Sequence, residues 1–62
     1  MRGNNYFRVF LGDEIVMERV VLAMYREGSV ALKDDCGESK IINEVEIIEV
    51  NTIGRFIQLR DA

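Results

Sequence analysis

The feature that most constrains the fold is the regular spacing of turn-forming residues between short runs rich in β-branched side chains. Polar turns at residues 26–29 and 34–38 separate the strand-like segments 29–33, 40–42 and 45–50. The chain contains no proline, so no segment is barred from a central position in a sheet. Short strands at such spacing are typical of a small meander or barrel. We therefore predict an all-β fold with five to six strands.

Both ends of the chain alternate in the way that half-buried strands do. Residues 6–11 would place Phe7, Val9 and Leu11 on one face and Tyr6, Arg8 and Phe10 on the other. Residues 56–60 alternate as a last strand. We expect residues 1–5 to form a frayed tail, and residues 1–62 to form a single small domain.

The segment 14–25 permits two interpretations. As a strand it is apolar on both faces, which suits a bent strand that serves the core with different faces at its two ends. As a helix over about residues 13–27, it would have Asp13 as N-cap and Gly28 beyond its C-terminus, and would pack on a small antiparallel sheet in an α+β fold. Four β-branched residues argue for the strand, which we prefer.

The order of strand lengths resembles the Sm-like and SH3-like small barrels over about residues 7–50. An Sm-like RNA binder would carry an Asp and an Asn around the turn before its third strand, and an Arg-Gly pair near its fifth. At those places this chain carries Tyr25-Arg26-Glu27-Gly28-Ser29 and Glu49-Val50-Asn51, which keep neither signature. The resemblance implies an architecture, and it carries over no ligand-binding residue.

The size and composition of the chain limit how it can be stabilised. A domain of 62 residues buries only roughly 60% of the surface that its unfolded chain exposes. One cysteine excludes an internal disulfide, and the absence of histidine removes the usual zinc ligand sets, so we expect no metal and no cofactor. Self-association is the remaining way to stabilise so small a domain, and an apolar content of 48% leaves enough apolar residues to form an interface.

Charge is distributed unevenly along the chain, whose net charge is −3. Residues 1–26 carry four arginines against three acidic residues, and residues 27–50 carry seven acidic residues against two lysines. Residues 51–62 carry two arginines against one aspartate. An acidic middle segment repels a phosphate backbone, so the composition disfavours nucleic-acid binding.

One row of side chains is the best candidate for a binding site. Tyr6, Arg8 and Phe10 would alternate on one face of the first strand, and Arg19 and Tyr25 could join them from a paired second strand. Aromatic and guanidinium groups in such a row can stack on bases or hold an anionic or aromatic side chain of a partner. The alternative is that the aromatic residues pack against a neighbouring subunit or the second side of the barrel, with Arg8 lying over them.

Cys36 and the acidic residues around it do not form a recognisable catalytic or metal motif. No histidine can activate the thiol, and neighbouring carboxylates should raise its pKa. Residues 34–38 are too short and lack the alternating oxygen ligands of a calcium loop. Glu44 and Glu46 alternate as the outward face of a strand would, where their charge opposes edge-to-edge aggregation.

These observations favour a binding module over an enzyme. A catalytic base would have to be a carboxylate or lysine in a cleft, which so small a domain rarely encloses. The leading hypothesis is protein–protein interaction, as a homo-oligomer or as an adaptor or inhibitor of a larger partner. The alternative is nucleic-acid or nucleotide binding through the arginine and aromatic face; an acidic decoy of nucleic acid is a third and weaker possibility. We expect a cytoplasmic protein with no membrane partner, because the lone thiol suits a reducing compartment and no run of about 18 apolar residues is present.

Overall fold

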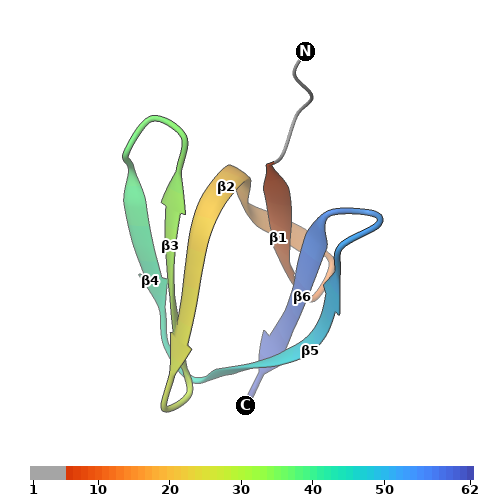
Figure 1. The fold of residues 1–62 in the computed structure, drawn as a ribbon. Coiled ribbons are helices and arrows are strands. Elements are labelled where there is room, and N and C mark those ends of the chain that lie inside the picture. The colour runs from red at the N-terminus through yellow and green to blue at the C-terminus, as the bar shows by residue number, and fades with distance from the viewer. Residues whose placement is uncertain (1–5) are drawn as a thin grey trace.

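A computed structural model describes residues 6–62, and it is all-β (Figure 1). It contains six strands: β1 (Phe7–Leu11), β2 (Glu14–Arg26), β3 (Ser29–Asp34), β4 (Ser39–Ile42), β5 (Val45–Asn51) and β6 (Phe56–Asp61). The prediction of an all-β fold is confirmed at this level. The predicted tail at residues 1–5 lies outside the described residues. Within residues 6–62, no helix is long and apolar enough to cross a membrane.

The six strands form one mixed sheet in the order β4-β3-β2-β1-β6-β5. Neighbouring strands are antiparallel except β1 and β6, which run parallel. This parallel pair puts β6 between β1 and β5, so β5 becomes one edge of the sheet and β4 the other. The sheet is therefore not closed into the predicted Sm-like or SH3-like barrel, because among the described residues no ladder joins its two edge strands.

The chain passes from one half of this sheet to the other at Asn43 and Glu44. Figure 1 shows β2, β3 and β4 as one half, β1, β5 and β6 as the other, and the link after β4 crossing between them. Glu44 has a positive φ of 59°, and the next amide, of Val45, donates to the carbonyl of Gly28 at 2.8 Å. The amide of Ala62 donates to the carbonyl of Glu44 at 2.9 Å. These bonds fix the start of β5 to the β2–β3 turn and to the end of the chain after β6.

Residues 14–25, which permitted two interpretations, lie in the long bent strand β2. The alternative helix over residues 13–27 is thus excluded. The first part of β2 pairs with β1 and the second part with β3, with register shifts on either side of Val20. These shifts place Met17, Val20 and Ala23 opposite Val9, Phe7 and Leu32 on the inner face. Inward positions that are three residues apart imitate a helical repeat, which explains the ambiguity of the sequence.

The core lies between the two halves of the bent sheet. Its buried residues come from every strand except β4: Val9, Val20, Val30, Leu32, Val45, Ile57 and Leu59. Branched aliphatic residues suit this position because they pack well on a pleated surface. Many large apolar residues stay exposed outside it: Tyr6, Ile15, Val21, Leu22, Met24, Tyr25, Ile41, Ile48, Val50 and Ile53. The generous apolar content is therefore only partly used inside the monomer.

The β2–β3 turn depends on a glycine. Glu27 and Gly28 both have positive φ, 50° and 80°, as a type I′ hairpin turn requires. An alanine at position 28 would be strained there, so we expect Gly28→Ala to lower the free energy of unfolding by about 1 kcal/mol or more. Urea denaturation measures this. Gly28→Asn should retain most of the stability, since asparagine tolerates this backbone conformation; equal stability of Gly28→Ala and the wild type would contradict the assignment.

Candidate functional site

Two residues of the predicted row, Arg8 and Phe10, are in contact in the structure, and Phe56 of β6 lies beside them. The guanidinium carbon of Arg8 lies 5.8 Å from the ring centroid of Phe10. The ring of Phe10 meets the ring of Phe56 edge to face, with their centroids 6.1 Å apart. The parallel pairing of β1 with β6 brings Phe56 beside Arg8 and Gln58 beside Phe10. Sequence reasoning missed Phe56, because it assigned no pairing partner to the last strand.

The other three predicted site residues lie elsewhere. Tyr6 precedes β1 and is 37% exposed. Arg19 lies at the bend of β2, where its guanidinium is 4.0 Å from the carboxylate of Asp35 and its carbonyl accepts the Asp35 amide. Tyr25 pairs with buried Val30 on the inner face, and its hydroxyl donates to the carbonyl of Val45 at 3.3 Å. The structure thus joins Arg8 and Phe10 but gives Arg19 and Tyr25 separate contacts.

A second surface, which sequence reasoning did not single out, covers the outer side of β2, β3 and β4. Met24, Ala31 and Ile41 are direct cross-strand neighbours and form an apolar row across the three strands. Met24 is 54% exposed and Ile41 67% exposed. Arg26 continues the same side of β2, and Lys33 the same side of β3. We call this surface the outer face: Leu22, Met24, Arg26, Ala31, Lys33 and Ile41.

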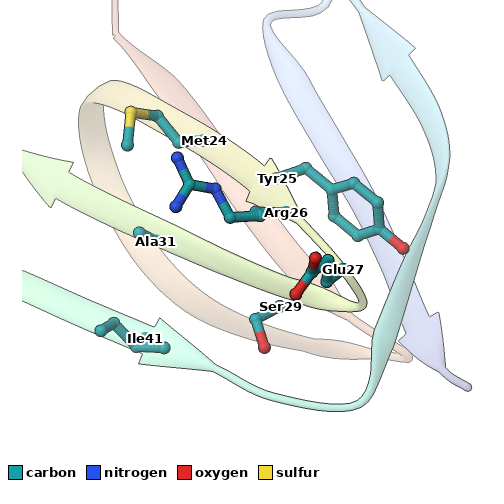
Figure 2. Close-up of a pocket in the computed structure, with 7 residues that line it drawn as sticks. All are labelled: Met24, Tyr25, Arg26, Glu27, Ser29, Ala31 and Ile41. Carbon is teal, nitrogen blue, oxygen red and sulfur yellow. The ribbon is translucent and has the colours of Figure 1, made fainter.

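Figure 2 shows how one part of the outer face is arranged. Met24, Arg26 and Ile41 line a shallow hollow of about 650 Å³, together with Ala31, Ser29 and residues of the β2–β3 turn. The ring of Tyr25 points away from Met24, toward the other half of the sheet (Figure 2). The hollow therefore has an apolar floor, with the cation of Arg26 and the carboxylate of Glu27 at its border. It also lies next to β4, the edge strand whose far side has no partner strand among the described residues.

A third surface is an apolar groove of about 240 Å³ at the end of the molecule where β1 and β6 begin. We call it the apolar groove. It is lined by Phe7, Val20, Val21, Leu22, Ala23, Val50 and Ile57, which are all apolar. The bend of β2 supplies one wall, while β1, β5 and β6 supply the other.

Cys36 lies in the β3–β4 turn beside two carboxylates. Asp35 and then Asp34 raise the pKa of the thiol, because a negative charge disfavours the thiolate; a hydrogen bond with Asp35 acts in the same direction. The predicted rise in the thiol pKa is confirmed. Asp34 also holds the turn, since its Oδ1 accepts the amides of Cys36 and Glu38 at 3.0 and 2.8 Å. Potential ligand atoms of Asp34, Asp35 and Cys36 lie within 4.8 Å of one another, at an exposed turn.

The raised pKa leads to a prediction about thiol reactivity. At pH 8 the fraction of thiolate is reduced, so Cys36 should react with iodoacetamide more slowly than a free cysteine. Asp35→Asn removes the largest cause and should speed alkylation several-fold at this pH. Asp61→Asn, at the end of β6, is the control and should leave the rate unchanged. Equal rates for Asp35→Asn and the wild type, followed by mass spectrometry, would show that the carboxylate has no influence.

No protein-family model matches the chain, and no curated protein matches it in sequence. Function must therefore be argued from the surfaces themselves. The outer face combines exposed apolar residues, two cations and an open strand edge. Arg8, Phe10, Phe56 and Gln58 line a smaller hollow of about 290 Å³, and the ring of Phe10 is already in contact with Arg8 and Phe56.

Proposed function

We propose that the protein is a non-enzymatic binding module that recognises another protein through the outer face. The observation that carries this proposal is the exposed row of Met24, Ala31 and Ile41, which runs across three strands to an open edge. Contiguous apolar residues on a surface are costly to leave in water and are typical of interaction sites. The protein would act as an adaptor or an inhibitor of a larger partner.

The chemistry of the outer face defines the partner. An apolar side chain of the partner would rest between Met24 and Ile41. Acidic groups of the partner would face Arg26 and Lys33, on the side of the hollow away from Glu27. A partner segment in extended conformation could add to β4, because the free edge of that strand offers backbone donors and acceptors. The partner is therefore a protein with an exposed segment that alternates apolar and acidic residues.

Site-specific photocrosslinking tests this proposal and identifies the partner. A benzophenone amino acid at Ile41 places the reactive group on the outer face, where the native side chain is largely exposed. The same group at Glu49, an exposed residue of β5 at the opposite edge of the sheet, is the matched control. Irradiation in cells of the source organism should give one discrete adduct from position 41 and none from position 49. No adduct at position 41, or the same adducts at both positions, would refute the proposal.

A second candidate function is binding of single-stranded nucleic acid through Arg8, Phe10 and Phe56. Its support is the contact of one guanidinium with the ring of Phe10, which meets the ring of Phe56 edge to face on the neighbouring strand. Such groups can stack on bases, and their affinity would fall steeply with added salt. Fluorescence anisotropy with a labelled oligonucleotide at low salt separates the two functions. Binding that is lost in Arg8→Ala and kept in Ile41→Asp would favour this candidate.

A further inference from the structure

Ile53 is an isolated apolar residue held out into solvent at the tip of the β5–β6 turn. It is 96% exposed, more than any other large apolar residue of residues 6–62. The turn around it is braced, because the side-chain oxygen of Asn51 accepts the amide of Gly54 at 2.6 Å. The turn is also fixed to β1, since the amide of Arg8 donates to the carbonyl of Arg55 at 3.0 Å. Two hydrogen bonds therefore hold the turn in a conformation that leaves Ile53 exposed.

The apolar groove lies next to this turn. Val50 at the end of β5 and Ile57 at the start of β6 flank the turn, and both line the groove. Figure 1 shows the β5–β6 turn at the same end of the molecule as the start of β1 and the bend of β2. Ile53 does not fill the groove of its own chain, because its side chain is almost fully exposed. One end of the molecule therefore carries both an exposed apolar projection and an apolar groove that none of residues 6–62 fills.

We infer that a second copy of this chain occupies the groove, with Ile53 of each copy inserted into the apolar groove of the other. A twofold symmetric contact requires that one surface patch carry both complementary elements, and the β5–β6 end meets this condition. A groove of about 240 Å³ has room for one isoleucine side chain. No lining residue is charged, so no buried charge opposes the contact.

The small size of the core supports a symmetric dimer. A chain of 62 residues has a marginal core. In the dimer each copy would receive one isoleucine, which would pack beside the buried Val20 and Ile57 and so extend its apolar core. This inference goes beyond the proposed function, since it concerns a groove that shares only Leu22 with the outer face, and a different partner. Each can fail while the other holds: substitution of Ile53 tests the dimer, and substitution of Ile41 tests the outer face.

Sedimentation equilibrium of the full chain tests the dimer. The wild type should show a mass twice that of the 7.1 kDa chain, with a dissociation that depends on concentration. Ile53→Asp should raise the dissociation constant about a hundredfold or more, because symmetry removes both contacts at once. The side chain of Ile53 is almost fully exposed among residues 6–62, so this variant should fold normally, as circular dichroism will show. Ile41→Asp, the matched control on the outer face, should dimerise like the wild type.

A mixing experiment tests the reciprocal geometry. Ala23→Leu fills the groove with apolar atoms and should abolish the homodimer. A mixture of Ile53→Asp and Ala23→Leu should recover a weaker heterodimer, because Ile53 of one variant still meets the open groove of the other. A wild type that stays monomeric up to millimolar concentration overturns the inference. So does a dimer that is lost in Ile41→Asp and kept in Ile53→Asp, or a mixture that forms no heterodimer.

Discussion

Replacing Leu59 by alanine is expected to lower the free energy of unfolding by about 3 kcal/mol. Leu59 is fully buried in β6, between Leu11 of β1 and Ile47 of β5. Truncation removes apolar contacts on both sides and leaves a cavity that a sheet held by two ladders cannot close. Few core substitutions in this chain should have a larger effect.

The loss from Leu59→Ala is a large share of the total, because the free energy of unfolding of so small a domain is itself small. A domain of 62 residues is stable by about 3–9 kcal/mol, so Leu59→Ala should leave a measurable unfolded fraction in water. Urea denaturation followed by circular dichroism gives the midpoint and the slope. Ile53→Ala is the control, since its side chain is in solvent in the monomer, and it is measured at concentrations where the wild type is monomeric. A midpoint for Leu59→Ala equal to that of Ile53→Ala would contradict the assigned core.

The second large effect is expected on binding. Ile41→Asp should weaken binding to the partner captured from position 41 by about a hundredfold, because it loses an apolar contact and places a charge in a desolvated interface. The substitution should leave the fold intact, as Ile41 is 67% exposed on an edge strand. Isothermal titration calorimetry with the purified partner measures the change.

The matched control for this effect is Ile48→Asp. Ile48 is about half exposed on β5 and belongs to neither the outer face nor the apolar groove. The same chemical change there should leave the affinity within about twofold of the wild type, as is usual for substitutions outside an interface. Equal losses in Ile41→Asp and Ile48→Asp would indicate a general effect of the added charge and not a contact with the outer face.

The sequence predicted the strands well because their turns carry local signals. The turn at Gly28 and the alternation of residues 56–60 depend on neighbours in the chain. Strand β2 was harder, because shifts in its register with β1 and β3 place Met17, Val20 and Ala23 on one face at a spacing of three residues. That spacing resembles a helix in a single sequence, and only the pairing with β1 and β3 resolves it.

The topology and the sites depend on contacts between distant residues, which no local pattern encodes. The parallel pairing of β1 with β6 joins residues almost fifty positions apart, and it decides both the open sheet and the contact of Phe56 with Phe10. The outer face depends on the register that aligns Met24, Ala31 and Ile41. None of these three residues stands out in the sequence. They form a continuous apolar surface only because the strands align them side by side.

Binding of a protein to the outer face is tested most directly by titrating the isotope-labelled chain with the captured partner and following the backbone amides by NMR. The largest shifts should fall on Met24, Ala31 and Ile41 and extend along β4, while amides around Arg8 and Ile53 change little. Shifts centred on Arg8, Phe10 and Phe56, or the absence of shifts on β2, β3 and β4 at saturation, would contradict binding at the outer face.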